Sequence, residues 1–171
     1  GKLIVTISKS WDSIGAAKTI VPQNYFVAVS GGSPIQFAGT MTVTKNSNTS
    51  YSYTVTNGKC WNSSWTILWD CNRTFTQTAG VATTTDPLDD EYTTYGSAKG
   101  TNRNGKTFDV NVPANDPIVR KMNCQWVSSG KFELTPEGLD TRTVDFAYPN
   151  GGQCDDKATL TIKGNSFEFT L

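Results

Sequence analysis

Residues 122–171 alternate apolar and polar side chains so regularly that few folds can accommodate them. The apolar members of this alternation are Phe132 and Leu134; Val144, Phe146 and Tyr148; Ala158, Leu160 and Ile162; and Phe167, Phe169 and Leu171. A period of two is typical of strands that bury one face and expose the other. We therefore expect a series of short strands whose apolar side chains, Phe167, Phe169 and Leu171 included, line one interior.

Residues that favour chain reversal separate these runs. Gly, Pro and Asn gather at 129–130, 136–138, 149–152 and 163–165, where they supply the fixed or positive φ that a turn needs. Further strand candidates precede this stretch at 3–7, 25–29, 35–44, 51–55, 92–99 and 108–112. The sequence therefore predicts strands that are joined mainly by hairpins.

The expected fold is one all-β domain over residues 1–171, built as an antiparallel, hairpin-rich β-sandwich. A sandwich is preferred because one apolar face of each strand must be covered. A meander β-barrel and an extended sheet of stacked hairpins are the alternatives. Asn57-Gly58 is the strongest short hairpin signal, and 80–91 forms the longest connection.

Three tryptophans, Trp61, Trp65 and Trp69, recur at every fourth residue. On one strand this spacing would place all three on the same face. A turn at 62–64 would instead break the run after Trp61. We expect Trp65 and Trp69 to lie in the core, because Ile67 shares their face.

The charge balance and residue usage exclude several classes of function. The 15 basic and 15 acidic side chains leave no net charge to neutralise phosphates, so nucleic acid is not an expected partner. Histidine is absent, which removes the usual general base of a Ser or Cys nucleophile and the commonest metal ligand. No apolar run approaches the roughly 20 residues of a membrane helix. We expect a protein without catalytic residues and without a direct membrane span.

The chain has 4 cysteines and no C-x-x-C pair, which favours disulfides over a zinc or thioredoxin-like site. We expect Cys60 to pair with Cys71 and Cys124 with Cys154, since each pair lies within one series of hairpins. Such bonds imply an oxidising, extracytoplasmic compartment. Four buried thiols in a reducing cell are the alternative.

Two groups of carboxylates are candidates for chemistry. Asp86, Asp89, Asp90 and Glu91 crowd one loop, and Ca²⁺ takes roughly six to eight oxygen ligands from such loops. The spacing is not that of an EF-hand, so we expect a solvated loop and no cofactor, with a calcium site as the alternative. Glu133 and Asp145 fall at outward positions of neighbouring strand candidates. A glycosidase pair could stand there, although solvated charges are the expectation.

Several segments resemble one group of bacterial proteins. They are FAGTMTVTKN, RTFTQT, DPLDDEY, GSAKGTNRNGKTFDVNV, RKMNCQWVSSGKFELTPEGLDTRTVDF and GGQCDDKATLTIKG. Together, over 35–171, they are similar to the C-terminal β-rich region of uncharacterised secreted proteins and lipoproteins of Bacteroidetes, and Cys124 and the Cys154-Asp155 step match. The opening GKLIVTIS more weakly resembles fimbrillin-like and adhesin-like domains. The resemblance implies an exported protein, secreted or at the outer-membrane surface, and supplies no activity.

We accordingly expect a non-enzymatic cell-envelope or secreted module with a binding or structural role, adhesin-like, whose partner is a glycan or a surface protein. Exposed Trp61, Tyr92 and Tyr95 are the candidate ligand-binding residues, because aromatic faces on a rigid sheet can stack against sugar rings. A dedicated glycan-binding module is the first alternative and a carboxylate-dependent glycan hydrolase the second. The sequence does not indicate an oligomeric state.

Overall fold

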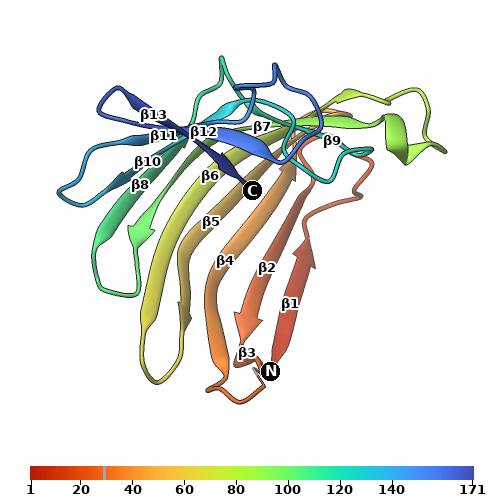
Figure 1. Ribbon diagram of the computed structural model, residues 1–171. Coiled ribbons are helices and arrows are strands. Elements are labelled where there is room, and N and C mark those ends of the chain that lie inside the picture. The colour runs from red at the N-terminus through yellow and green to blue at the C-terminus, as the bar shows by residue number, and fades with distance from the viewer. Residues whose placement is uncertain (29) are drawn as a thin grey trace. The chain divides into compact units, whose positions relative to one another are not determined.

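The computed structural model of the protein describes residues 1–28 and 30–171, and these form strands and turns (Figure 1). The strands, in chain order, are β1 (Lys2–Ile7), β2 (Ala17–Gln23), β3 (Tyr25–Val27), β4 (Ile35–Lys45), β5 (Ser50–Trp61), β6 (Thr66–Ala79), β7 (Glu91–Thr101), β8 (Thr107–Val112), β9 (Ile118–Lys121), β10 (Lys131–Pro136), β11 (Arg142–Asp145), β12 (Lys157–Ile162) and β13 (Asn165–Thr170). One 3-10 turn, η1 (Pro87–Asp89), lies in the long connection after β6. The end of the strand expected at 25–29, Val29, lies outside the described residues.

Hydrogen bonding arranges the strands in the linear order β1-β2-β4-β5-β6-β7-β8-β10-β11-β12-β13, with β3 beside β4 and β9 beside β7. Neighbours along the chain are mostly neighbours in this order, because short turns join them into antiparallel hairpins. The order has two ends, β1 and β13, so the sheet is not closed on itself. The prediction of an all-β, antiparallel, hairpin-rich fold is confirmed.

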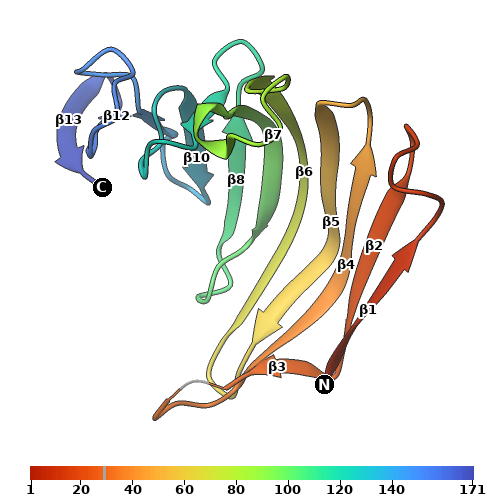
Figure 2. The ribbon, with the colours of Figure 1, turned by 90° about the vertical axis from the view of Figure 1, so that its right-hand side faces the viewer.

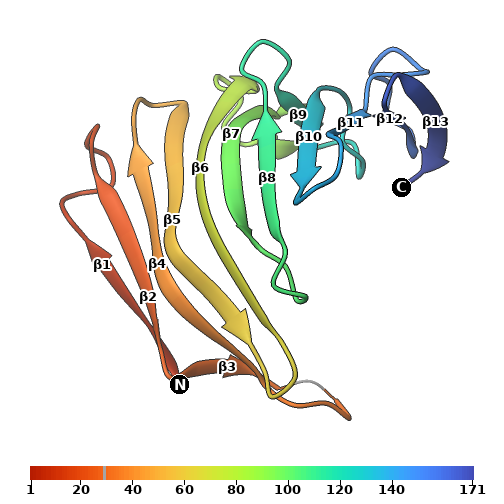
Figure 3. The same cartoon turned by 90° about the vertical axis from the view of Figure 1, so that its left-hand side faces the viewer.

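The chain forms two compact units. The first, unit 1, comprises residues 1–73 and 98–108, and the second, unit 2, comprises residues 74–97 and 109–171. In unit 1, β1, β2, β4 and β5 run side by side (Figure 2). In unit 2, β10 to β13 form consecutive antiparallel pairs (Figure 3). That the chain is one domain stays a prediction.

The Asn57-Gly58 step does not form the hairpin turn that its sequence predicts. It lies inside β5, where the pairing with β4 shifts by one residue between Ala38 and Thr40. Asn57 has a φ of 52°, and Gly39 across the ladder has a φ of 113°. A left-handed residue next to glycine suits a β-bulge as well as a turn, and here the long strands on both sides favour the bulge.

The turn between β5 and β6 falls instead at 62–65. The amide of Asn62 donates to the carbonyl of Trp65, and the side-chain oxygen of Asn62 accepts from the amides of Ser64 and Trp65. The turn expected at 62–64 is confirmed. The alternative prediction, a single strand that carries all three tryptophans, is wrong, since Trp61 ends β5 and Trp69 lies in β6.

The expected interior is much smaller than the alternation predicts. Among the described residues the buried apolar side chains are Ala16, Val55, Val112, Cys124, Val144 and Ala158. Phe167, Phe169 and Leu171 are 56%, 37% and 41% exposed, so their expected burial is wrong. Alternation of apolar and polar residues indicates only that the apolar side chains share one face of a strand. A second layer of structure must cover that face to bury them. No helix in the described part of the chain is long and apolar enough to cross a membrane.

Candidate functional site

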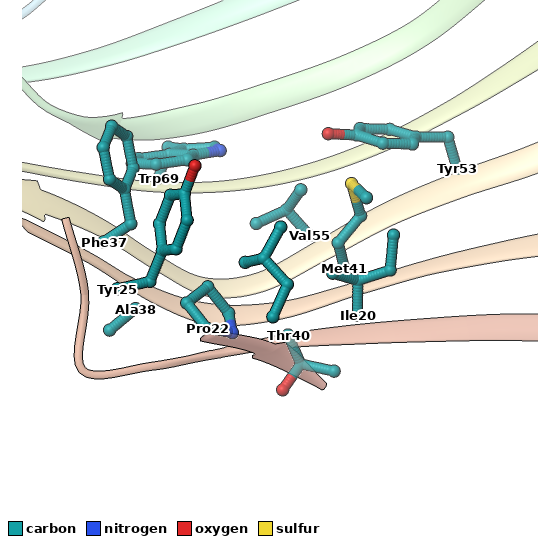
Figure 4. Close-up of a pocket in the computed structure, with 12 residues that line it drawn as sticks. Ile20, Pro22, Tyr25, Phe37, Ala38, Thr40, Met41, Tyr53, Val55 and Trp69 are labelled. Carbon is teal, nitrogen blue, oxygen red and sulfur yellow. The ribbon is translucent and has the colours of Figure 1, made fainter. Parts of the chain in front are cut away.

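The described residues of unit 1 form a pocket of about 210 Å³ on one face of its strands (Figure 4). Strand register explains why apolar side chains meet there. Ile20 in β2 pairs with Met41 in β4, and Met41 pairs in turn with Val55 in β5. Directly opposed residues of antiparallel strands point to the same side of the sheet. These three side chains therefore form a continuous apolar floor.

Three aromatic side chains, Tyr25, Phe37 and Trp69, gather at one end of the pocket (Figure 4). Tyr25 in β3 pairs with Phe37 in β4, and their ring centroids lie 6.1 Å apart at an interplanar angle of 54°. The tilted geometry is one that aromatic pairs prefer. These rings give the pocket an aromatic end wall.

Gly58 allows Trp69 to join this wall. A Cβ atom at Gly58 would lie 2.7 Å from Cε2 of the Trp69 indole and 2.6 Å from the Trp69 carbonyl oxygen. Real Cβ atoms do not approach other atoms so closely, so the indole lies flat against a position where only glycine fits. Trp69 is therefore a pocket residue. We expected it to lie in a closed core, and it instead forms part of the wall of an open pocket.

Tyr53 lies at the opposite end of the pocket (Figure 4). Burial raises the pKa of its hydroxyl above the ordinary value, the nearby Cys71 raises it further, and the positive charge of Arg73 lowers it. Cys71 and Arg73 therefore lie within electrostatic range of the Tyr53 hydroxyl. Cys71 lies two residues after Trp69 along β6 and Arg73 lies four residues after it. The side chains of Trp69, Cys71 and Arg73 therefore share one face of that strand.

Arg73 brings a strongly basic group toward this end. Its Nε atom is buried and has no hydrogen-bond partner among the described residues. A buried donor without a partner costs about 1 to 3 kcal/mol, and more when it is charged. Arg73 is not itself one of the residues that line the pocket, but its unsatisfied cation acts on Tyr53, which does line it.

The two cysteines of this region do not form the expected bond: Cys60 and Cys71 are both free. Gly58 lies against Trp69, Cys60 is two residues closer to the turn, and Cys71 is two residues further from it. The two Cα atoms are thus about 13 Å apart along the hairpin at roughly 3.3 Å per residue, whereas a disulfide requires about 7 Å or less. Burial raises the pKa of both thiols, so neither is an activated thiolate.

The second expected disulfide is confirmed in unit 2. Cys124, just after β9, is bonded to Cys154, just before β12, and closes a loop of sequence separation 30. Cys124 is 4% exposed whereas Cys154 is an exposed residue, so the bond ties the small core of this unit to its surface.

The predicted ligand-binding aromatics belong to two different units. Trp61 belongs to unit 1, and the ammonium of Lys59 lies 4.6 Å from its ring centroid. Tyr92 and Tyr95 belong to unit 2. The Tyr92 hydroxyl donates to Asp90 at 3.0 Å, and Tyr95 is 37% exposed. A cation on one face of Trp61 competes with a sugar ring for that face.

Each carboxylate of the acidic loop accepts a hydrogen bond from the protein. Asp86 accepts from the Leu88 amide and caps η1, whereas Asp89 accepts from Thr83 at 2.6 Å. Asp90 accepts from the Gln77 side-chain amide at 2.8 Å, and Glu91 accepts from the Thr78 hydroxyl at 2.7 Å. Within residues 1–28 and 30–171, no three His, Cys, Asp or Glu side chains come together as a group that could hold a metal ion. The calcium site stays a prediction.

The candidate glycosidase pair, Glu133 and Asp145, lies on paired strands of unit 2 but is engaged elsewhere. The ammonium of Lys131 lies 3.4 Å from Asp145 and 2.7 Å from Asp116. The hydrogen bond with Asp116, followed by the charge of Asp145, raises the pKa of Lys131. Glu133 accepts from the side-chain amide of Asn111 at 2.9 Å. The carboxylates thus serve as partners for neighbouring donors.

Comparisons of the chain with protein families, with curated proteins and with solved structures found no match. The resemblance to secreted proteins of Bacteroidetes therefore stays a prediction. The apolar pocket was missed by the sequence analysis, because its walls come from six strands whose register the sequence does not reveal. The sequence signal that could have indicated the pocket was the alternation within 35–44, because it places Met41 on an apolar face.

Proposed function

We propose that the chain is a non-enzymatic binding module of an exported or envelope-associated protein, and that it binds an apolar small molecule in the pocket of unit 1. The observation that carries this proposal is the pocket itself: aromatic and aliphatic side chains from neighbouring strands surround about 210 Å³ of space. Concave, mostly apolar sites on rigid elements are where proteins bind small molecules.

The energetic argument rests on the character of the lining. Transfer of each methylene group from water to an apolar site contributes about 0.8 kcal/mol. Strand pairing holds Ile20, Met41 and Val55 in place before any ligand arrives, so little side-chain ordering opposes binding. An apolar guest is therefore favoured over a sugar, whose hydroxyls would require hydrogen-bonding partners from this lining.

Two further observations support the rest of the proposal. The chain has no histidine, and its paired carboxylates Glu133 and Asp145 are engaged with neighbouring donors, which favours binding over catalysis. The disulfide between Cys124 and Cys154 favours an oxidising compartment, as expected for an exported protein.

The test is a titration of the full chain with 1-octanol, followed by amide NMR shifts. We expect shifts that saturate and that are centred on residues of β2, β4 and β5. Ile20→Ser should weaken binding about tenfold or more, because it places a hydroxyl in the pocket floor. Val21→Ser is the matched control, since Val21 is the next residue of β2 and points to the opposite face.

Absence of saturable shifts, or equal effects of the two serine variants, would show that the pocket does not bind apolar molecules. A glycan screen separates the alternative. Binding of a glycan that survives Ile20→Ser and is lost in Trp61→Ala would replace the apolar site with an aromatic sugar site.

A further inference from the structure

We propose that the ligand of this pocket is a free straight-chain carboxylic acid, with its alkyl chain in the pocket and its carboxylate bound by Arg73. The inference rests on the proposed function and goes further by assigning the polar group of the ligand and the residue that recognises it. It depends on three observations: the position of Arg73, its missing partner, and the size of the pocket.

The position of Arg73 follows from β6. Trp69, Cys71 and Arg73 alternate along this strand and share one face, and Trp69 stands at the aromatic end of the pocket. From Trp69, β6 continues for about 13 Å to Arg73 at roughly 3.3 Å per residue. Arg73 acts on the hydroxyl of Tyr53, which stands at the other end (Figure 4). The guanidinium therefore lies near the end of the pocket opposite the aromatic wall.

Arg73 lacks a counter-charge. Its Nε is buried without a hydrogen-bond partner, and no ion pair joins its guanidinium to a carboxylate within the described part of the chain. The nearby Asp70 already accepts a hydrogen bond from the Asn57 amide at 2.7 Å. A partly buried guanidinium is best satisfied by a planar carboxylate, which can accept two parallel hydrogen bonds. A ligand carboxylate would supply the missing partner.

The size of the pocket limits the alkyl chain. A dry protein cavity of about 150 Å³ holds one benzene molecule of six carbon atoms. By proportion, the 210 Å³ of this pocket accommodates roughly eight carbon atoms. No charged side chain lines its body, so the chain of the acid should be unsubstituted. Octanoate matches both requirements.

The experiment is a calorimetric titration of the whole 171-residue chain with octanoate, hexanoate, butyrate and 1-octanol. We expect octanoate to bind about tenfold or more tightly than 1-octanol, as a charge-assisted hydrogen bond implies. Affinity should rise about fourfold with each methylene group from butyrate to octanoate. Both results would follow from a carboxylate held at one end and a chain buried in the pocket.

Substitution of the cation tests the assignment. Arg73→Gln should reduce octanoate affinity about tenfold or more and leave 1-octanol affinity unchanged, whereas Arg73→Lys should retain part of the preference for the acid. Arg103→Gln is the matched control, because Arg103 belongs to unit 1 but stacks on Trp65, 4.3 Å from its ring centroid, and not on the pocket. Retained 1-octanol binding shows that each variant is folded.

The outcomes separate the two proposals. Equal binding of octanoate and 1-octanol, or an equal loss of octanoate affinity in Arg73→Gln and Arg103→Gln, overturns the carboxylate assignment and leaves the apolar site standing. Absence of binding by all four probes overturns the proposed function as well. If Arg73→Gln does not fold, the comparison of octanoate with 1-octanol on the unchanged protein decides.

Discussion

Gly58 shows how one residue can shape the pocket. Its φ is not in the left-handed region, so its role is spatial: the Trp69 indole occupies the volume that a side chain would fill. Gly39 differs, because it combines a φ of 113° with a Cβ position 2.8 Å from the Asn57 carbonyl oxygen. The two glycines let β4, β5 and the Trp69 ring approach one another beside the bulge.

We predict that Gly58→Ala lowers the free energy of unfolding by about 1 to 3 kcal/mol, because the added methyl group must displace the Trp69 ring or the backbone of β6. Denaturant unfolding measures the loss, and weaker 1-octanol binding should accompany it. Gly105→Ala serves as comparison: nothing lies near its Cβ position, and its φ is 73°. It should cost only the backbone strain of about 1 kcal/mol and leave binding intact. A stable Gly58→Ala protein with full binding would contradict this role.

At the scale of strands and turns, local patterns predicted much and long-range arrangement little. Alternation identified the strands because it depends only on the two faces of one segment. The Asn57-Gly58 step was misassigned because the same backbone preference serves a turn and a bulge. The ambiguity is resolved only by the partner strand, here Gly39 of β4. The burial of Phe167 was misjudged for a related reason, since alternation does not reveal whether anything covers a face.

Some features of the disulfides and the candidate site could likewise be predicted from the sequence, and others could not. The Cys124–Cys154 bond could be predicted because both residues belong to one series of hairpins. Cys60 and Cys71 satisfied the same criterion and failed, because the bulge and the turn at 62–65 fix a register that keeps them apart. The role that we propose for Arg73 depends on its effect on Tyr53 of β5, and no local sequence pattern reveals that these two residues interact.

The disulfide provides a prediction about the segments that it joins. Opening the 30-residue loop by Cys124→Ser with Cys154→Ser should lower the free energy of unfolding by about 3 to 4 kcal/mol, because the unfolded chain regains loop entropy. Cys60→Ser with Cys71→Ser is the matched control and should change it far less, since it removes no cross-link. Thiol titration of the denatured, unreduced protein should find two thiols per chain. Four thiols would show that the bond does not form.

For the molecule as a whole, the raised pKa values of Cys60, Cys71, Tyr53 and Lys131 point toward alkaline instability. Burial raises the pKa of Cys60 and Cys71 above the ordinary 9.0 and that of Tyr53 above 10.0. The hydrogen bond with Asp116 raises the pKa of Lys131 above 10.5. Each group therefore binds its proton more tightly in the folded state than in the unfolded state.

Linkage then fixes the direction of the pH dependence. A group with a raised pKa contributes stability that is fully present below its unfolded value and is lost as the pH rises through its folded value. We predict that the contribution of these groups to the free energy of unfolding, measured with denaturant, is constant from pH 7 to about 9. It should fall between about pH 9 and 11. Cys60→Ser with Cys71→Ser should move the onset from near 9 toward 10, because Tyr53 and Lys131 then titrate first. A stability that rises over this interval would contradict the assignment, because it would require groups whose pKa falls on folding.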